Sequence, residues 1–410
     1  MQKFDVLIVG GGMVGLSLAL AIRKQTTLSV AVVDKSEPAP LTDEPELRVS
    51  AINAVSQQLF TALDVWPLIQ AQRAQPYTNM HVWDKDGIGQ VSFSISDIPS
   101  TLNASALGSI IENSVIRTAL WQKAANDSGI TLLTGDRITN ISHSDSESFI
   151  SFTNQPPVLA KLIVGADGAN SWVRDQTQIT HTFRDYDHHA IVATVECQLG
   201  HQNTAWQVFL PTGPLAFLPL YQNNACSIVW STSPEEAQRL TGLSPEDFSK
   251  EITMQSDGKL GNISLASDRL TFPLRMRMAH QFVEGRVVLV GDAAHTIHPL
   301  AGQGVNLGLL DAAALAETLA HAQQKYGDNW CNVKSLRAFE RWRKADAVEM
   351  IAAMETIKQT FTPQLSPVKL LRGIGMSLLD KAAPIKSMML KQAMGDKGKL
   401  PELMHVKRTV

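Results

Sequence analysis

Three glycines near the N-terminus separate a short apolar run from a segment with the composition of a helix. The apolar run, Phe4–Val9, suits a central strand of a parallel sheet, and Met13–Arg23 suits the helix. Gly10 permits a tight turn between them, Gly12 lets a pyrophosphate approach the backbone, and Gly15 lets the helix pack on the strand. This order of elements predicts a Rossmann-like sheet that binds a dinucleotide at the N-terminus of the helix.

Asp34 is a second sign of a nucleotide site, because it ends the next predicted strand, Leu28–Val33. A carboxylate there can accept hydrogen bonds from both hydroxyl groups of an adenosine ribose, and it would repel a 2′-phosphate. The uncharged segment Val6–Ile22 is also compatible with a membrane anchor or a signal peptide. The glycines inside this segment and Asp5 before it favour the strand, turn and helix instead.

Composition and charge narrow the class of protein. The chain has 410 residues, of which 44% are hydrophobic and 18% are charged, so it can form two domains of ordinary soluble character. Its net charge of −3 gives no attraction to nucleic acid. The three cysteines, Cys197, Cys226 and Cys331, form no CxxC pair, which favours a reducing, cytoplasmic location and argues against a structural metal site.

The sequence changes character along its length. Between about Ile191 and Phe272 it consists mainly of short apolar runs that suit strands, whereas the flanking segments alternate strands and helices. We therefore expect an α/β fold (α+β overall) with a discontinuous nucleotide-binding domain, an inserted antiparallel β-sheet domain for the substrate, and a helical C-terminal region. The expected boundaries are 1–75, 98–180 and 275–345 for the first, 76–97 and 181–274 for the second, and 346–410 for the third.

Two further segments have the character of ligand-binding turns. One ends a buried strand in the sequence Gly-Ala-Asp167-Gly, and Arg174 follows seven residues after the aspartate. The other ends a buried strand at Gly291-Asp292, where a carboxylate needs a polar partner such as a sugar hydroxyl group. The loop Pro299–Asn306 then runs into a helix, whose first backbone N–H groups favour a negatively charged ligand group. Each segment alone is compatible with an ordinary turn, whereas their combination predicts one shared site.

With these three motifs in this order, the chain resembles the flavin-dependent aromatic hydroxylases and, within them, the ubiquinone-biosynthesis hydroxylase family. The resemblance implies that FAD is bound, with Asp167 near its pyrophosphate and Asp292 on its ribityl chain. Arg48 corresponds to a family arginine near the flavin, while Asn113 stands where the wider family often has arginine, so only a weak contact is implied for it. The FAD-binding residues implied in this way are Gly10, Gly12, Met13, Val14, Gly15, Asp34, Arg48, Asn113, Asp167, Gly291, Asp292, Pro299, Gly302, Gln303, Gly304, Val305 and Asn306.

Other runs along the chain resemble the branch of this family that acts on 2-octaprenylphenol more closely than the branch that acts on a later demethoxy-quinone intermediate. These runs are Arg48–Asn53, Val82–Lys85, Ile111–Ser114, His188–Thr194 and Cys226–Ser231. The resemblance implies that NAD(P)H, as a transient donor, reduces FAD, and that a flavin hydroperoxide formed with O₂ hydroxylates the ring of a prenylated phenol. The alternatives are another lipid-directed flavoenzyme, such as a reductase or epoxidase, and a flavin-bearing scaffold subunit of a biosynthetic assembly.

Few residues can be assigned to the substrate from the sequence. Phe217 and Leu218 belong to an apolar predicted strand, in which alternation points one of them toward the substrate and the other away. His298, next to the glycine-rich loop, either faces the substrate or is a structural hydrogen-bonding group. No catalytic base is assigned, and no set of ligands with metal-site spacing accompanies the histidines.

The C-terminal segment combines basic and apolar residues. Residues 366–399 contain seven lysine and arginine residues against two aspartates, and apolar residues repeat at helical spacing in Leu370–Leu379. Such a helix can lie on the inner, anionic face of a membrane, or it can dock its apolar side on the protein. The sequence leaves both open, together with homo-oligomerisation and membership of a ubiquinone-biosynthesis assembly.

Overall fold

The computed structural model describes residues 1–98, 105–144, 146–297, 304–361, 366–396 and 398–405. Its first sheet is largely parallel and consists of β1 (Lys3–Val9), β2 (Val30–Asp34), β8 (Ile130–Thr134), β9 (Ile138–His143), β10 (Ser148–Phe152), β11 (Val158–Gly165), β18 (Val283–Glu284) and β19 (Val287–Leu289). The order is β18–β19–β11–β1–β2–β8, and the antiparallel hairpin β9–β10 extends from β11. The pairs that β1 makes with β2 and β11 are parallel, as are β2 with β8 and β11 with β19.

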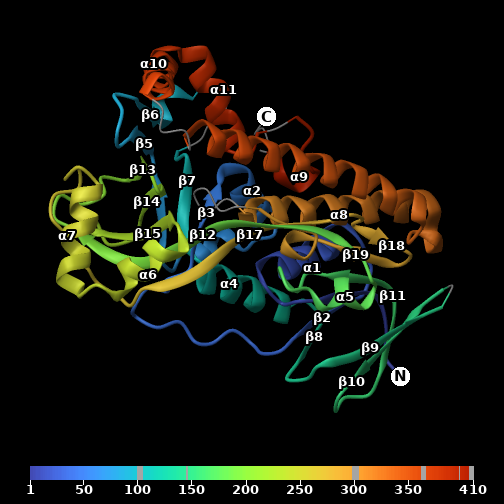
Figure 1. Cartoon of the computed structure of the whole chain (residues 1–410). Coiled ribbons are helices and arrows are strands. Elements are labelled where there is room, and N and C mark those ends of the chain that lie inside the picture. The colour runs from blue at the N-terminus through green and yellow to red at the C-terminus, as the bar shows by residue number, and fades with distance from the viewer. Residues whose placement is uncertain (99–104, 145, 298–303, 362–365, 397, 406–410) are drawn as a thin grey trace.

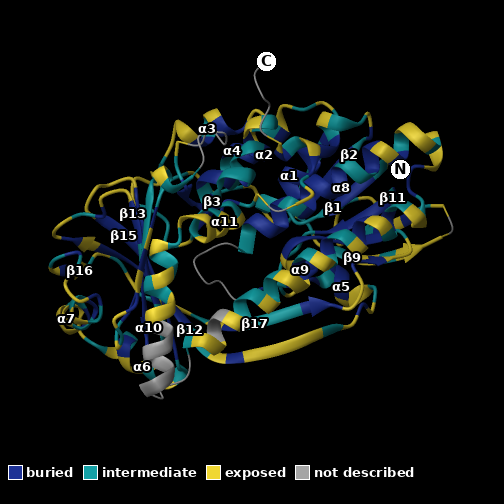
Figure 2. Cartoon of the chain, turned by 90° about the horizontal axis from the view of Figure 1, so that it is seen from above, coloured by how far each residue is buried: buried dark blue, intermediate teal, exposed yellow. Residues whose placement is uncertain are grey.

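The central strands of the first sheet, β1, β2 and β11, are buried on both faces (Figure 2). The helices α1 (Met13–Gln25), α4 (Asn113–Ala125) and α8 (Gly304–Tyr326) share one apolar core with residues of alternate positions in β1, among them Val6 and Ile8. Leu7 between them belongs to the core on the opposite face, to which α9 (Val333–Phe361) contributes Ala347. This two-sided burial explains why the strand is almost continuously apolar.

The predicted turn between β1 and α1 depends on two glycines. Gly10 has a φ of +114°, and a Cβ atom there would lie 2.3 Å from the carbonyl oxygen of Ala166. A Cβ atom on Gly15 would lie 1.9 Å from the carbonyl oxygen of Gly10. Neither position can carry a side chain without moving the backbone, so the strand, the turn and the helix pack as closely as the spacing of the glycines predicted.

The second sheet has nine strands: β5 (Asn79–Asp84), β6 (Gln90–Ser94), β12 (His181–Cys197), β13 (Thr204–Leu210), β14 (Gly213–Pro219), β15 (Ala225–Thr232), β16 (Ile263–Leu265), β17 (Leu270–Ala279) and β20 (His295–Thr296). Their order is β20–β17–β12–β15–β14–β13–β5–β6, and β16 pairs with β12. Every pair is antiparallel except that of β13 with β5. The predicted α/β fold with an inserted, mainly antiparallel sheet is therefore confirmed.

Two short helices, α6 (Pro234–Gly242) and α7 (Pro245–Gln255), cover one side of this second sheet and share a core with it. The long strands β12 and β17 extend from the second sheet toward the first (Figure 1). The strand β17 runs without a break across the expected boundary between residues 274 and 275. The residue boundaries given for the domains stay predictions.

The remaining elements close the molecule around these sheets. A small sheet of β3 (Val49–Asn53), β4 (Ala74–Tyr77) and β7 (Gly108–Glu112) lies between them, and the short helices are α2 (Ala54–Ala62), α3 (Trp66–Gln70) and α5 (Trp172–Gln176). At the C-terminal end, α10 (Ser366–Lys381) packs on β6, and α11 (Ala383–Ala393) packs on α10 (Figure 1). Within the described ranges, none of the helices combines the length and the apolar character that crossing a membrane requires.

Candidate flavin site

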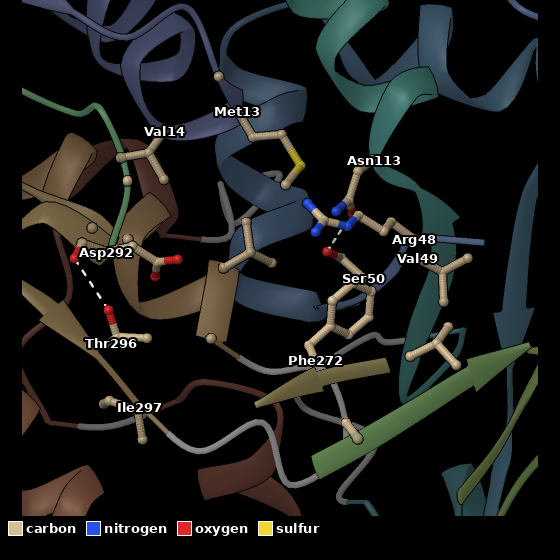
Figure 3. Close-up of a pocket in the computed structure, with 18 of the residues that line it drawn as sticks. Met13, Val14, Arg48, Val49, Ser50, Asn113, Phe272, Asp292, Thr296 and Ile297 are labelled. Carbon is tan, nitrogen blue, oxygen red and sulfur yellow. Dashed lines mark hydrogen bonds between the residues drawn. The ribbon is translucent and has the colours of Figure 1, made fainter. Parts of the chain in front are cut away.

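A cavity of about 510 Å³ lies where the first sheet, the small sheet and the second sheet meet, and we call it the main cavity because the predicted motifs converge on it. Turns and polar groups form much of one side, which Figure 3 shows around Arg48, Asn113 and Asp292. The second sheet forms the other side, mainly with apolar side chains but also with Ser227, Arg275 and Thr296. The first side includes Gly12, Met13, Val14, Arg48, Ser50, Asn113, Gly291, Asp292, Gly304 and Val305, and the second includes Val192, Leu218, Val229, Phe272 and Leu274. Residues of motifs almost 300 positions apart in the chain thus line one cavity.

A second cavity, of about 650 Å³, lies on the other side of the N-terminus of α1. Gly12, Met13, Leu47, Arg48 and Asn113 line both cavities. The remaining wall of the second cavity comes mainly from the loop 38–46 and the first turns of α4. Because the cavities share these five residues, a ligand with two large ends can lie across the start of α1 with one end in each, as a dinucleotide requires.

The starts of α1 and α8 both lie at the main cavity and leave room for a ligand. A Cβ atom on Gly12 or on Gly304 would meet no heavy atom within 4 Å, so space is open beside both backbones. Gly12 is the N-cap of α1, and no side chain caps the free N–H groups of that helix. Free N–H groups and the positive dipole ends favour an anionic ligand, which fits a pyrophosphate at α1 and the anionic edge of a reduced flavin at α8.

Asp34 is held at the glycine turn by Arg117, a residue that none of the motifs contains. Its Oδ2 accepts a hydrogen bond of 2.6 Å from the Gly11 N–H. Arg117 of α4 donates to Asp34 Oδ1 over 3.2 Å and to the Gly11 carbonyl oxygen over 2.9 Å. Arg117 also lines the second cavity, where its charge would attract phosphate. The sequence holds one indication of this role, because Arg117 follows Asn113 by one helical turn and therefore lies on the same side of α4.

The carboxylate of Asp167 is used within the protein. Its Oδ1 accepts a hydrogen bond of 2.5 Å from the Ser171 hydroxyl group, and its Oδ2 accepts one of 3.1 Å from the Val173 N–H at the start of α5. Asp167 lines a third cavity, of about 570 Å³, together with Gly10 and Asp34, whereas its neighbours Ala166 and Gly168 line the main cavity. The backbone of this turn, more than its carboxylate, therefore faces the proposed flavin position.

Arg174, which the sequence marked after Asp167, ties two of the motif turns together. Its guanidinium group is buried and donates hydrogen bonds of 3.1 Å to the carbonyl oxygens of Ala169 and Ala293. Ala169 follows the turn at the end of β11, and Ala293 ends the 3₁₀ helix Gly291–Ala293 that follows β19. Arg174 thus fixes the distance between these two turns without lining the main cavity itself.

Asp292 reaches into the main cavity from the side opposite Arg48 and Asn113 (Figure 3). Asp292 is exposed to the cavity, while the protein packed around it removes enough water to raise the pKa of Asp292 above its ordinary value. The nearby charges of His295 and Arg277 oppose this rise. A carboxylate at the cavity needs hydrogen-bond donors there, and the hydroxyl groups of a ribityl chain are suitable ones.

A buried ion-pair network holds the turn that carries Asp292. Asp311 of α8 accepts hydrogen bonds from the Gly291 N–H (2.9 Å), from His295 Nε2 (2.6 Å) and from Arg343 Nε of α9 (2.7 Å). All three side chains of the network are buried. Burial alone would raise the pKa of Asp311, but the charges and hydrogen bonds of His295 and Arg343 hold it below its ordinary value. Asp311 is therefore an anion that joins α8, α9 and the Gly291 turn.

Arg48 and Asn113 line the main cavity, whereas Asn306 is buried in the first turn of α8 and is not among the lining residues. The Arg48 guanidinium group lies over the Phe272 ring, 5.0 Å from its centre, and Asn113 Oδ1 accepts a hydrogen bond of 2.7 Å from Ser50. The Asn306 amide group donates to the Ala51 carbonyl oxygen over 2.8 Å and accepts from the Asn53 N–H over 3.1 Å. Asn306 therefore joins α8 to β3, and its implied contact with FAD stays a prediction. Four further predicted residues lie outside the described residues, namely His298, Pro299, Gly302 and Gln303.

The alternation of β14 distinguishes the two candidates for the substrate side. Leu218 lines the main cavity, on the wall that faces Asp292. Phe217 is fully buried on the other face of the sheet, in the core that includes Phe248 and Ile252 of α7. Of the pair, Leu218 is therefore the candidate for contact with the substrate.

Comparison with known families identifies the cofactor of this chain. Residues 3–348 match the family described as "FAD binding domain". Solved structures with the same fold include p-nitrophenol 4-monooxygenase PnpA from Pseudomonas putida, with a TM-score of 0.77, 17% identity and full coverage of both chains. PqsL from Pseudomonas aeruginosa, described as a probable FAD-dependent monooxygenase, has a TM-score of 0.75, with 19% identity over 92% of this chain and 100% of its own. The fold and the match define a flavoprotein that binds FAD.

Similarity to curated relatives extends almost end to end. The 3-demethoxyubiquinol 3-hydroxylase of Escherichia coli (strain K12) is 36% identical over 96% of this chain and 99% of its own. Ubiquinone hydroxylase UbiL of Rhodospirillum rubrum is 33% identical over 95% of this chain and 89% of its own. The human ubiquinone biosynthesis monooxygenase COQ6, mitochondrial, is 30% identical over 94% of this chain and 92% of its own. The chain therefore belongs to the ubiquinone-biosynthesis family of FAD-dependent aromatic hydroxylases.

Proposed function

We propose that this chain hydroxylates the aromatic ring of a polyprenylated phenol in ubiquinone biosynthesis, with NAD(P)H and O₂ as co-substrates. The observation that carries the proposal is the two-sided main cavity, in which turns suited to FAD face an apolar wall. Val192, Leu218 and Val229 of this wall offer apolar surface to a ring with a prenyl substituent. The names of two relatives, 3-demethoxyubiquinol 3-hydroxylase and ubiquinone hydroxylase, support a substrate of the ubiquinone class without choosing between the two branches.

FAD supplies the redox chemistry of such a reaction, which is the activation of O₂ with electrons from NAD(P)H. The residues of this chain position it and keep water away. Asp292 and Arg48 would hold it from opposite sides of the main cavity, and the N–H groups at the starts of α1 and α8 would face its anionic groups. The apolar wall around Leu218 would exclude water from the reacting ring, which limits wasteful release of hydrogen peroxide.

An oxygen-labelling experiment tests the proposal. The purified FAD-loaded chain is expected to transfer a labelled oxygen atom from ¹⁸O₂ to the ring of a prenylated phenol, as product mass spectrometry would show. Offering both a prenylphenol and a demethoxyquinol separates the two branches of the family, and we expect turnover of the prenylphenol. NAD(P)H oxidation without label in the organic product would indicate a reductase, and label in the prenyl chain would indicate an epoxidase. A biological role that survives loss of FAD binding would indicate a scaffold.

Replacing Leu218 with serine is expected to uncouple NAD(P)H oxidation from hydroxylation. Burying a leucine side chain is worth about 1.5–3 kcal/mol, so its loss from the wall should raise the KM for the prenylphenol roughly tenfold or more. The added hydroxyl group should also admit water to the cavity. Measured together, NAD(P)H consumption should continue while hydroxylated product falls and hydrogen peroxide rises.

Phe217→Leu is the matched control, because it changes the opposite face of the same strand. This variant should lose some stability from the core that includes Phe248, but its ratio of product to NAD(P)H should stay that of the unaltered chain. Fully coupled turnover in Leu218→Ser would show that β14 does not wall the substrate site. Equal uncoupling in both variants would indicate a general loss of structure.

A further inference from the structure

Exposed apolar side chains gather on the C-terminal helices. Among the described residues, six of the fifteen exposed large apolar side chains belong to α10, α11 and the β5–β6 turn, so random scatter over the surface does not account for them. We call this surface the outer face, and it consists of Ile88 (72% exposed), Ile374 (43%), Leu378 (62%), Ile385 (48%), Met388 (62%) and Met389 (40%). A Cβ atom on Gly373 of α10 would lie 3.0 Å from Ile88, which places Ile88 beside the helix.

The outer face follows helical spacing on both helices. Ile374 and Leu378 are one turn apart on α10, while Ile385, Met388 and Met389 are three and four residues apart on α11. Both helices lie at the edge of the molecule above β6 in Figure 1, and exposed stretches of α10 face the viewer in Figure 2.

The opposite sides of the same helices are fixed to the protein. Met376, Leu379, Leu390 and Met394 pack with Phe93 of β6 in one apolar cluster. In addition, the Asp380 carboxylate accepts a hydrogen bond of 3.0 Å from the Ser92 N–H, and Lys386 forms an ion pair of 3.1 Å with Asp97. Docking on the body of the protein therefore uses one side of α10 and α11, and it leaves the outer face exposed.

The charge of the segment suits an anionic lipid surface. Residues 366–399 carry five more basic than acidic residues, and Lys381 at the end of α10 is exposed next to the outer face. An apolar helical face bordered by basic side chains is the pattern of a helix that lies at the interface of a bilayer with anionic headgroups. A protein partner with a flat apolar surface would gain nothing from this excess of positive charge.

The position of the outer face relative to the main cavity agrees with a lipid substrate. Tyr77 packs both against the cluster beneath α10 and α11 and against the cluster that contains Leu218. Leu218 in turn lines the main cavity. The outer face thus lies over the same part of the molecule as the apolar wall, so a bilayer there would bring a membrane-dissolved prenyl chain close to that wall.

We propose that the outer face of α10 and α11 rests on the surface of a bilayer that contains anionic phospholipid. The proposal deepens the proposed function, on which it rests, by assigning the surface through which a prenylated substrate is met. The side chains of the outer face enter the interfacial layer of the membrane, and exposed basic side chains of the segment, such as Lys381, face its headgroups.

Sedimentation with vesicles tests this assignment on the full-length, FAD-loaded chain. Vesicles of phosphatidylcholine with phosphatidylglycerol are expected to bind the chain, and vesicles of phosphatidylcholine alone are expected to bind it more weakly. The double variant Leu378→Glu with Met388→Glu should lower the bound fraction about tenfold or more, because two apolar side chains leave the interface and two negative charges face the headgroups. Raising the salt concentration should weaken binding to the anionic vesicles.

The double variant Leu199→Glu with Met254→Glu is the matched control. Both residues are 58% exposed, and the change in net charge is the same. Leu199 lies in the turn that follows β12, and Met254 lies on α7, which is well separated from α10 and α11 in Figure 1. The control should bind vesicles as the unaltered chain does. Equal binding by the outer-face variant, or equal loss in both double variants, would overturn the proposal. A dimer that dissociates in the outer-face variant, with no vesicle binding by the unaltered chain, would instead assign the face to a second copy.

A short-tailed, water-soluble prenylphenol separates this proposal from the proposed function. The outer-face variant should hydroxylate it as fast as the unaltered chain does, because no membrane is needed to deliver it. Hydroxylation of that phenol by an unaltered chain that binds no vesicles would overturn the membrane assignment alone. Vesicle binding by a chain that hydroxylates no phenol would overturn the proposed function and leave the surface assignment standing.

Discussion

Replacing Asp311 with alanine is expected to lower the free energy of unfolding by about 3–5 kcal/mol, the range found when one partner of a buried ion pair is removed. The substitution would leave the fully buried Arg343 without its partner on α8 and the Gly291 N–H without an acceptor. It would also free the turn that carries Asp292, so FAD should be retained less well. Denaturant unfolding followed by tryptophan fluorescence, and fluorescence titration with FAD, measure the two effects.

A double-mutant cycle shows whether the network is the cause. In the Asp311→Ala background Arg343 keeps its ion pair with Asp346 but loses the buried partner of its Nε atom. Replacing Arg343 with methionine in that background removes this incompletely compensated buried charge, so the double variant should be clearly less destabilised than the sum of the single variants. The control is Glu236→Ala, which breaks the exposed ion pair of 2.7 Å with Arg239 and should cost less than about 1 kcal/mol. Additive effects of the Asp311 and Arg343 substitutions would contradict an energetic coupling between α8 and α9.

Much of the fold could be predicted because its signals are local. The strand before Gly10 is buried on both faces, so its sequence is apolar throughout, and the glycines at positions 10 and 15 are required by close backbone contacts. The hairpin of β5 and β6 likewise follows from alternation about the turn at Asp86-Gly87. The parallel pairing of β13 with β5 had no such signal, because the two strands are separated by more than a hundred residues.

The site could be predicted as a set of turns but not as a set of contacts. Glycine-rich turns have a recognisable sequence because the backbone itself approaches the ligand. The partners of Asp34 and Asp311 on α4 and α9 could not be inferred in this way, because each is fixed by tertiary packing. Arg117 and Arg343 lie on helices where an arginine is most often an exposed residue, and only the structure shows that they face a cavity and a buried aspartate. The same reason left the choice between Phe217 and Leu218 open.

Replacing Asp292 with asparagine is expected to change stability and cofactor binding in opposite directions. Burial raises the pKa of Asp292, so the ionised carboxylate opposes folding at neutral pH, and the variant without FAD should unfold at a higher temperature than the unaltered apo-protein. The same carboxylate is the proposed acceptor for the ribityl hydroxyl groups. Hydrogen bonds to a charged group are worth about 1.5–3 kcal/mol, so the Kd for FAD should rise roughly 10- to 100-fold.

The pH dependence distinguishes this explanation from a simple change in packing. Because the pKa of Asp292 is raised in the folded state, ionisation of its carboxyl group lowers the free energy of unfolding as the pH rises through that pKa. This destabilisation is absent at a pH low enough for the carboxyl group to be protonated in both the folded and the unfolded state. The stability gain of Asp292→Asn should therefore disappear as the pH falls toward the ordinary value of 3.8 and persist at neutral pH. Asp311→Asn is the control, because it should lower both the stability of the apo-protein and its affinity for FAD. An Asp292→Asn variant that loses stability at neutral pH, or that binds FAD unchanged, would contradict the role given to this carboxylate.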